Sequence, residues 1–514
     1  MRALLSVYDK TGLVTLGAGL VELGWELVSS GGTARALSEA GLPVQGVEEV
    51  TGWPEMLGHR VVTLHPAVHG GILADRSSPE HAADLERHRI TPVDLVVANL
   101  YPFRSAPSIE MIDIGGPAMV RAAAKNSDWV GVVVDPADYG PVLDELRADG
   151  SLGAATRRQL ARAAFAATAA YDAAIVEWFD AGGPGGEPQP AAGEVLPATI
   201  HLALERAAEL RYGENPHQAG ARYRPVGAAT WWDEVVQHLG LPLSYLNLYD
   251  ADAAWSLVHD LAPLVPPAGA AVAIVKHANP CGAAVAGDLA TAYQRALEGD
   301  ERSAFGGIVA LGATVDAATA ERMVAGPQAD VVVAPGYDDG VVEALAAKRK
   351  NTRVLSAPPP VAGPLHLRQL ADGFLAQSAR HFARGRDEWQ VATKVGPTDE
   401  QWRDAELAWR LCGHVKSNCV VLVNQGQAVG IGAGQQSRVG AAEIAAAKAE
   451  GRAAGGASAT DGFYPFPDGV EVAAAAGVAV VVQPGGSVRD DEAVAAADRL
   501  GLAMVLTGER QFLH

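Results

Sequence analysis

Lys276 and His277 are adjacent residues whose side chains are well suited to moving protons. They lie in the segment VKHANPCG, directly after an apolar stretch that predicts a buried strand, and Pro280 and Gly282 predict a turn just beyond them. Histidine titrates near neutral pH, and a neighbouring lysine disfavours the imidazolium while donating to a developing anion. The pair therefore indicates acid-base catalysis, with a solvated surface pair as the alternative.

A second candidate site is the glycine-rich segment SGGTA, which follows a predicted strand and precedes a predicted helix. Gly31 and Gly32 allow the backbone to form a concavity whose N–H groups face an anion. Lys10 and Thr11, at the end of the preceding predicted strand, add a charge and a hydroxyl. The segment predicts a phosphate-binding loop, and an ordinary glycine-rich turn is the alternative.

Three further segments place polar side chains near strand ends or helix starts. They are NLYPF with Tyr101, IDIGG with Asp113 and AAAKN with Lys125. Ligands of doubly wound sheets bind at the carboxyl ends of the strands. Asp113 alone could be a helix cap and Lys125 a solvated charge, but together the three segments indicate a site in the first part of the chain.

Two histidines have the spacing of a zinc pair on a helix. His65 and His69 are four residues apart, but Pro66 argues against a helix that runs through both, and no acidic residue stands between them. We therefore expect no metal there, and hydrogen-bonded structural histidines instead.

Two segments resemble known nucleotide-binding or nucleoside-processing motifs without matching them. The segment VGIGAGQQSR carries three glycines, but the dinucleotide fingerprint requires a further glycine where Gln435 stands. Gln435, Gln436 and Arg438 are expected to contact a different ligand. VKHANPCG resembles part of a zinc deaminase motif, but Asn279 occupies the position of the glutamate and Cys281 lacks a paired cysteine.

The elements that must position these residues alternate between strands and helices. Apolar patterns predict strands at 3–7, 25–29, 94–99, 129–134, 271–275, 307–311, 419–424, 478–483 and 503–506. They predict helices at 11–23, 117–125, 138–149, 156–179, 290–298 and 441–451. This alternation is typical of an α/β protein with mostly parallel sheets.

Proline and glycine clusters divide the chain. The segment AGGPGGEPQPAAGE at 181–194 cannot hold a regular element, and it predicts a boundary between domains at 1–190 and 195–514. A proline cluster at 358–364 divides the second domain into subdomains at about 195–365 and 366–514. We expect three sheets, one in each part.

Composition and charge exclude several classes of protein. With 514 residues, 49% of them hydrophobic and 19% charged, the chain is expected to be globular. Its 40 basic and 60 acidic residues give a net charge of −20, which disfavours nucleic acids and anionic membranes as partners. Three cysteines and no apolar run of about 18 residues predict a cytoplasmic protein without a membrane span.

Taken in order, the segments resemble the bifunctional purine biosynthesis family that joins an AICAR transformylase to an IMP cyclohydrolase. The resemblance rests on SGGTA, RVVTLHPAVHGGIL, NLYPF, IDIGG, AAAKN, LRYGENPHQ, YLNLYD, VKHANPCG, SAFGGIVA, HVKSN, GIGAGQQSR and DGFYPFPD. It implies a methylglyoxal-synthase-like domain followed by two cytidine-deaminase-like subdomains, in a homodimer. It also implies formyl transfer from 10-formyltetrahydrofolate to AICAR, giving formyl-AICAR, and then dehydrative closure to IMP, with no metal required.

The resemblance further implies roles in the transformylase part. His277 would be the general base or proton relay for the AICAR amine, Lys276 would assist the tetrahedral intermediate and the departing folate nitrogen, and Asn418 would orient that centre. The implied AICAR-binding residues are Arg211, Tyr212, Asn247, Phe305, Gly306, Asp330, Arg438 and Arg510. The implied folate-binding residues are Phe463, Phe466 and Asp468.

In the cyclohydrolase part, the resemblance implies one group of residues at the phosphate and another nearer the reacting atoms. The phosphate group is Lys10, Ser30, Gly31, Gly32 and Thr33. The second group is Arg60, Thr63, Tyr101, Asp113 and Lys125.

Two positions depart from the family pattern. Val62 stands where the family usually has lysine, and Tyr8 stands where it has a serine. Valine can neither donate a proton nor hold a charge, but intramolecular ring closure can gain about 7 to 11 kcal/mol from proximity alone. We expect a lowered cyclohydrolase rate. The alternatives are a transformylase whose first domain is silent, and a nucleotide sensor or scaffold without catalysis.

Overall fold

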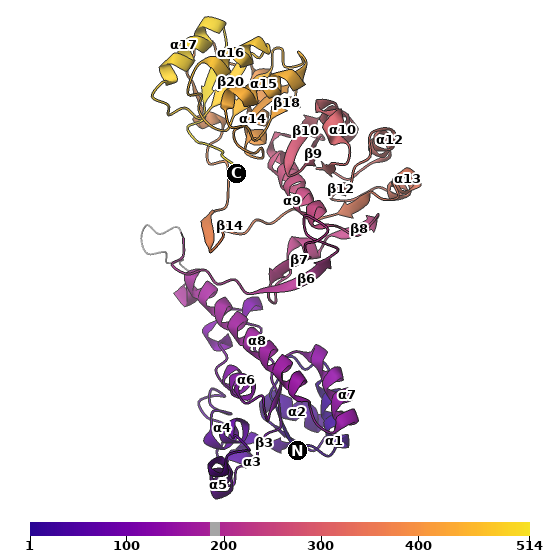
Figure 1. The fold of residues 1–514 in the computed structure, drawn as a ribbon, viewed down its shortest axis with the longest axis vertical. Coiled ribbons are helices and arrows are strands. Elements are labelled where there is room, and N and C mark those ends of the chain that lie inside the picture. Colours follow the sequence, from indigo (N-terminus) through magenta and orange to yellow (C-terminus); the bar gives the residue numbers. More distant parts are fainter. Residues whose placement is uncertain (186–195) are drawn as a thin grey trace. The chain divides into compact units, whose positions relative to one another are not determined.

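The computed structural model describes residues 1–185 and 196–514, which form two compact units. Unit 1 contains residues 1–205 with 225–228, and unit 2 contains 206–224 with 229–514 (Figure 1). The boundary expected at 181–194 falls mostly in residues 186–195, outside the described residues. Within the described ranges, no helix is both long and apolar enough to cross a membrane.

Unit 1 is built on a five-stranded parallel sheet. In spatial order its strands are β3 (Gln45–Gly46), β2 (Glu26–Ser29), β1 (Arg2–Leu5), β4 (Leu95–Val97) and β5 (Gly131–Val133). Its central strands are almost fully buried, as expected for a parallel sheet between layers of helices. Strand order reverses between β1 and β4, and ligands of such sheets bind at this switch point.

The helices of unit 1 connect and cover these strands. They are α1 (Leu13–Glu22), α2 (Gly31–Glu39), α3 (Val47–Thr51), α4 (Pro66–Leu73), α5 (Pro79–His88), α6 (Gly115–Lys125), α7 (Tyr139–Asp149) and α8 (Ala154–Asp180). Every strand and helix predicted for this part of the chain is present, with ends shifted by a few residues.

Unit 2 is built on a twelve-stranded sheet that consists of two halves with the same strand order. The first half runs β8 (Val236–Leu239), β13 (Arg353–Ser356), β12 (Val331–Ala334), β11 (Ile308–Leu311), β9 (Ala270–Lys276) and β10 (Asn279–Ala286). The second runs β16 (Gln390–Val391), β21 (Ala503–Leu506), β20 (Val480–Gln483), β19 (Ala457–Thr460), β17 (Val420–Asn424) and β18 (Gln427–Gly432). β10 pairs antiparallel with β18, at Ala284 and Gln427. The expectation of a separate sheet in each subdomain is therefore wrong.

The helices of unit 2 repeat in the same way. The first half has α9 (Tyr245–Asp260), α10 (Leu289–Gly299), α11 (Glu301–Ala304), α12 (Ala317–Ala325) and α13 (Val341–Lys348). The second has α14 (Asp399–Cys412), α15 (Arg438–Ala449), α16 (Asp468–Ala475) and α17 (Asp490–Leu500). Trp255 of α9 and Trp409 of α14 are fully buried in one core that both halves share. Two small hairpins, β6 (Leu204–Leu210) with β7 (Gly220–Pro225) and β14 (Leu365–Gln369) with β15 (Phe374–Ser378), form separate sheets.

The predicted turn at Pro280 and Gly282 is wrong, because both residues lie inside β10. Gly282 is required there by close packing: a Cβ at this position would lie 1.9 Å from the carbonyl oxygen of Ala296 in α10.

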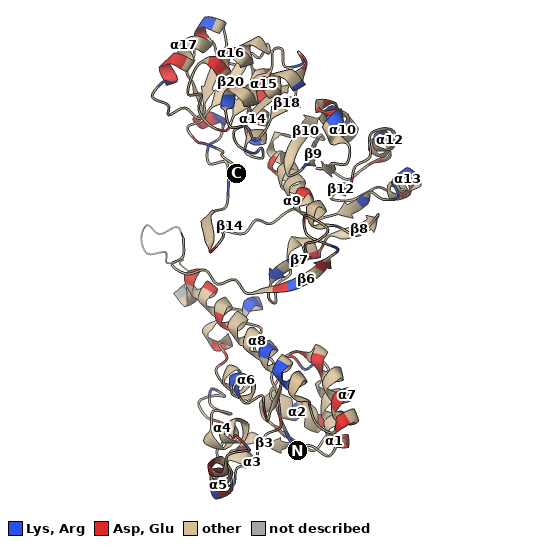
Figure 2. Ribbon diagram, in the orientation of Figure 1, with Lys and Arg blue, Asp and Glu red and all other residues tan. Residues whose placement is uncertain are grey.

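Acidic residues are spread over helices of both units rather than gathered on one element (Figure 2). The net charge of −20 therefore gives no element a clear role in binding.

Candidate active sites

The turn between β9 and β10 carries His277 in an unusual backbone conformation. His277 and Ala278 form a two-residue turn with φ values of 54° and 53°. This left-handed conformation is typical of tight hairpins but is disfavoured for residues with a Cβ. The buried carboxylate of Asp250 in α9 accepts both turn N–H groups, His277 N at 3.1 Å and Ala278 N at 2.8 Å. The turn thus presents the exposed His277 from a fixed backbone.

Several of the expected AICAR-binding residues lie next to this turn. Lys276 Nζ donates to the carbonyl oxygen of Phe305 at 2.8 Å. A Cβ on the following Gly306, which has a φ of 72°, would lie 3.9 Å from a carboxylate oxygen of Asp330. Burial raises the pKa of the Asp250 carboxyl, opposed by the N–H groups of the turn and assisted by the nearby Asp330 carboxylate. The structure therefore brings Lys276, His277, Phe305, Gly306 and Asp330 together.

Asn279 joins this turn to the second half of the unit. Its Nδ2 donates to the carbonyl oxygen of His277 at 3.2 Å, and its Oδ1 accepts from the backbone N–H of Lys416 at 3.0 Å. Lys416 is two residues before Asn418. The His277 turn and the Asn418 segment are therefore held beside each other where β10 and β18 pair.

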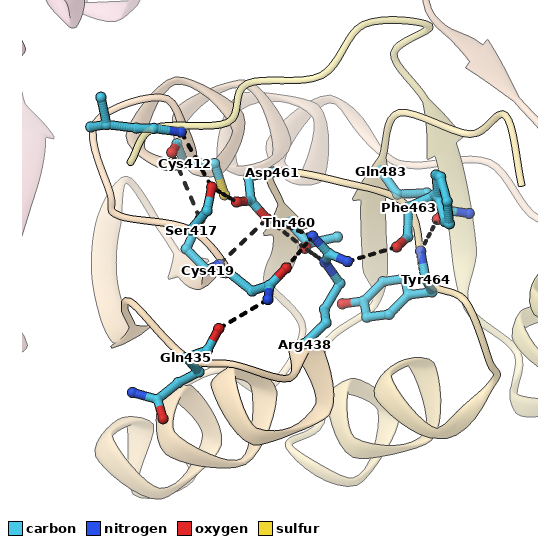
Figure 3. Close-up of polar contacts among 12 residues, drawn as sticks. Cys412, Ser417, Cys419, Gln435, Arg438, Thr460, Asp461, Phe463, Tyr464 and Gln483 are labelled. Carbon is cyan, nitrogen blue, oxygen red and sulfur yellow. Dashed lines mark hydrogen bonds and ion pairs between the residues drawn. The ribbon is translucent and has the colours of Figure 1, made fainter. Parts of the chain in front are cut away.

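Asn418 is itself held by a polar network around Arg438, whose partners Thr460, Asp461 and Phe463 are labelled in Figure 3. Asn418 Nδ2 donates to the carbonyl oxygen of Gln435 at 2.9 Å, and its Oδ1 accepts from Arg438 Nη2 at 2.9 Å. The same Nη2 is 2.9 Å from Oδ1 of Asp461, whose side chain is fully buried. Arg438 Nε and Nη1 donate to Thr460 Oγ1 and to the carbonyl oxygen of Phe463. The guanidinium expected to bind substrate is thus engaged by groups of the protein.

The remaining expected residues of unit 2 make contacts elsewhere. Asn247 closes a capping box with Ser244 at the start of α9. Four others lie in cation-π or helix-start positions: the guanidinium of Arg211 lies over the ring of Tyr212, that of Arg510 lies over Phe512, and Asp468 is the first residue of α16. Phe466 is exposed beneath Arg489. In the described part of the chain, none of them hydrogen-bonds to the His277 turn.

In unit 1, the residues expected at the phosphate lie around the start of α2. Thr33 Oγ1 accepts from the N–H of Val7 at 3.1 Å and donates to its carbonyl oxygen at 3.0 Å. Lys10 Nζ donates to the same carbonyl at 3.3 Å and lies 3.7 Å from where a Cβ of Gly32 would be. Ser30 is the N-cap of α2, and Gly31 and Gly32 are its first residues. A lysine thus stands beside the amino end of a helix, an arrangement suited to an anion.

The loops after β1 and β4 meet beside this helix end. Asn99 Oδ1 accepts the N–H groups of Tyr8 and Asp9, at 2.6 and 2.9 Å. The rings of Tyr8 and Tyr101 have centroids 5.4 Å apart. Burial raises the pKa of Tyr101, and the nearby carboxylate of Asp113 adds to the shift. Tyr8, one of the two departures from the family pattern, therefore lies within this site.

Asp113 and Thr63 lie at the start of α6. Asp113 Oδ1 accepts from the N–H of Gly116 at 2.9 Å, and burial raises the pKa of the Asp113 carboxyl. The buried Thr63 Oγ1 lies 3.0 Å from where a Cβ of Gly115 would be. Val62 is half-buried and packs against the apolar core, so it has no polar function at this place. The exposed Arg60 forms an ion pair with Glu110.

Lys125 is separated from these residues. Gly115 and Lys125 begin and end α6, so a rise of about 1.5 Å per residue places them about 15 Å apart along the helix axis. Lys125 lines a groove of about 620 Å³ together with Arg121, Phe165 and His69.

His65 accepts from Ala67 N as the N-cap of α4, as a structural histidine should. His69 Nε2 is buried without a hydrogen-bond partner among the described residues, contrary to expectation, and burial lowers the pKa of His69.

Sequence reasoning assigned no role to three residues that organise these sites. Asp250 supports the His277 turn, Asn279 connects it to Lys416, and Asn99 joins the loops after β1 and β4. A signal for Asp250 was present: both α9 and α14 have an Asp six residues after a capping-box Ser or Thr, and an Ala-Trp pair soon after it. Such a repeat over about 150 residues is visible only when the two halves are aligned by their structure.

Two α/β units, each with polar side chains gathered at strand ends, define an enzyme with two separate sites for small polar substrates. The family model described as AICARFT/IMPCHase bienzyme matches residues 123–448, and the one described as MGS-like domain matches residues 12–125. The chain therefore belongs to the AICARFT/IMPCHase bienzyme family. It is a bifunctional enzyme that joins an AICAR formyltransferase, with 10-formyltetrahydrofolate as cosubstrate, to an IMP cyclohydrolase.

Curated relatives match along their full length. The chain is 48% identical over 540 residues to the bifunctional purine biosynthesis protein PurH of Dinoroseobacter shibae, covering 100% of this chain and 98% of that protein. It is 47% identical over 527 residues to PurH of Synechococcus elongatus, covering 100% and 99%. Among solved structures, the crystal structure of ForH has 39% identity, covers 35% of this chain and 98% of its own, and gives a TM-score of 0.33. The predictions of the family, the α/β class and the MGS-like first domain are confirmed.

Proposed function

We propose that the two reactions of this bienzyme are divided between the two units, with formyl transfer in unit 2 and ring closure in unit 1. The observation that carries the proposal is the separation of the candidate groups: Lys276 and His277 lie on the turn of unit 2, and Lys10, Tyr101 and Asp113 lie at the switch point of unit 1. The domains expected at 1–190 and 195–514 correspond to this division.

In unit 2, His277 takes a proton from the 5-amino group of AICAR as that nitrogen attacks the formyl carbon. A C–N bond forms, the bond to the folate nitrogen breaks, and that nitrogen receives a proton. Lys276, fixed by Phe305, stabilises the tetrahedral intermediate and assists the departing folate nitrogen. Asn418 orients this centre, and Arg438 acts by holding the Asn418 amide.

The remaining residues of unit 2 are assigned to binding the two substrates. We assign AICAR to Arg211, Tyr212, Asn247, Phe305, Gly306, Asp330 and Arg510. We assign the folate to Phe463, Phe466 and Asp468.

In unit 1, the phosphate of formyl-AICAR binds at Lys10 and at the first turn of α2, from Ser30 to Thr33. Tyr101, Asp113 and Thr63 act near the atoms that close the ring, with Arg60 at the edge of the site. Without a lysine at position 62, cyclisation is slower, and Val62→Lys should raise its rate.

Lys125 ends α6, about 15 Å along the helix axis from Gly115, which lies beside Thr63 and Asp113, so we infer that Lys125 acts at this site from a second copy of the chain. We therefore propose a homodimer in which each copy supplies Lys125 to the other. Mixing Lys125→Ala with Asp113→Asn subunits should restore cyclisation that neither variant shows alone. The lack of any restoration in verified mixed dimers would refute the exchange of Lys125.

Three free thiols support a cytoplasmic location.

The division between units is tested by following both products separately. With AICAR and 10-formyltetrahydrofolate, absorbance should show tetrahydrofolate and IMP. Asp113→Asn should still release tetrahydrofolate but accumulate formyl-AICAR, while His277→Ala should close supplied formyl-AICAR to IMP without turning over folate. A single one of these variants that stops both reactions, while remaining folded, would refute the division.

A further inference from the structure

The conformation of the His277 turn depends on one buried carboxylate. Left-handed φ values at two successive residues with a Cβ are disfavoured. Without a supporting contact, His277 and Ala278 would therefore adopt other backbone conformations. The Asp250 carboxylate is the acceptor for both turn N–H groups, at 3.1 and 2.8 Å, and it is 9% exposed. Asp250 therefore selects the backbone conformation from which the His277 side chain projects.

The second half of unit 2 contains the same device without the histidine. Asp404 of α14 accepts the N–H groups of Gln425 and Gly426 at 2.9 and 2.8 Å, across a turn with φ values of 52° and 77°. The turn joins β17 to β18 as the His277 turn joins β9 to β10. Because Asp404 is 5% exposed and Asp250 is 9% exposed, the two carboxylates have similar burial, and each accepts two successive N–H groups of its turn. The fold therefore supplies its own control for the structural part of this interaction.

We propose that Asp250 is a positioning residue for formyl transfer, holding the His277 imidazole at the angle and depth from which it can reach the AICAR amine. The proposal rests on the proposed role of His277. Asp250 touches no reacting atom, so its effect passes through the backbone of the turn. Asn279, which donates to the His277 carbonyl, limits the movement of the turn on its other side.

The test compares Asp250→Asn with the matched variant Asp404→Asn. An asparagine keeps one acceptor, but its NH2 group faces the second turn N–H, so the turn loses its support in both variants. Because a displacement of about 1 Å at a reacting group can cost about 100-fold, Asp250→Asn should lower kcat of formyl transfer by about that factor. KM for AICAR should change little. Asp404→Asn should leave kcat unchanged, and both should still cyclise formyl-AICAR.

A rescue variant separates positioning from general destabilisation. Glycine adopts left-handed φ without cost, so Ala278→Gly in the Asp250→Asn background should restore part of kcat. The native turn of the second half already has glycine, Gly426, at the corresponding position. If Asp250→Asn does not fold, the folded Asp250→Glu variant, with a displaced acceptor, must show the loss of kcat instead.

The outcomes distinguish this inference from the function on which it rests. If His277→Ala abolishes formyl transfer but Asp250→Asn and Asp404→Asn have the same kcat, Asp250 is only structural and the inference fails. If His277→Ala leaves formyl transfer intact, the proposed role of the turn fails as well. A loss confined to Asp250→Asn and partly reversed by Ala278→Gly supports both.

Discussion

The two halves of unit 2 share their strand order, a buried tryptophan and an aspartate-supported turn, yet their turns carry different side chains. The first turn follows Lys276 with His277, and the second follows Asn424 with Gln425. Because backbone and support are alike, the difference lies in the side chains. The comparison teaches that the fold provides a place from which a residue can be presented, and that the residue decides the reaction.

The halves also differ at the strand ends that lie away from these turns. The first residue of α15 is Arg438 where α10 begins with Leu289, and Asp461 follows β19 where Gly312 follows β11. Antiparallel pairing of β10 with β18 brings the turn of one half to the buried network of the other. The proposed formyl-transfer site is therefore composite, because each half carries a different part of it.

The strongest way to break the comparison is to give the first turn the side chain of the second. His277→Gln should keep the turn, because Gln425 adopts the same left-handed φ, and should remove the proposed general base. Loss of positioned proton transfer predicts a fall in kcat of about 100- to 10,000-fold. Stopped-flow or steady-state absorbance of tetrahydrofolate formation measures it. Gln425→His is the control, and any gain of activity from it would contradict the composite site.

A second prediction concerns the network that the first half lacks. Arg438→Leu leaves the buried Asp461 carboxylate without its cation, so the free energy of unfolding should fall by about 3 to 5 kcal/mol. Urea unfolding followed by tryptophan fluorescence measures the change. Adding Asp461→Gly, as in the first half, should recover part of the loss because the unpaired charge is then absent. Equal stability of the single variant and the native protein would show that the pair contributes nothing.

The fold was largely predictable because its elements are encoded locally. Apolar runs such as those of β1 and β20 and the periodic pattern of α8 identified every strand and helix that the sequence analysis named, within a few residues. The joining of the two halves was not predictable, since the β10 and β18 pairing links residues about 140 positions apart and leaves no local pattern. Gly282 was misread for the same reason: its need for glycine comes from a helix that packs on the strand, not from a turn.

The sequence indicated the residues that we propose to carry the chemistry, but not the residues that support them. Lys276 and His277 are reactive types in an informative place, whereas Asp250 looks like any acidic residue on a helix until its partners are known. Arg438 shows the converse. Its charge suggested a ligand contact, and only the positions of its partners, such as Asp461 and Asn418, reveal that four of its five N–H groups donate within the protein.

The smallest predicted effect tests whether the two supporting carboxylates are equivalent. Burial raises the pKa of both Asp250 and Asp404 above the ordinary carboxyl value, against the opposing effect of the turn N–H groups. A carboxyl with a raised pKa holds its proton in the folded state to a higher pH than in the unfolded chain. The native protein therefore loses stability as pH rises from about 4 through the folded-state pKa, by about 1.4 kcal/mol for each unit between the two values.

Asparagine has no such proton, so the stability of Asp404→Asn relative to the native protein should improve across this pH range, and Asp250→Asn should show the same slope. Urea midpoints measured at a series of pH values for the native protein and both variants give the two slopes. Parallel slopes would mean that the halves differ only in what their turns present. A slope for Asp250→Asn alone would mean that its environment, with Asp330 and His277 nearby, has departed from that of Asp404, which has Glu400 and Arg403 as its charged neighbours.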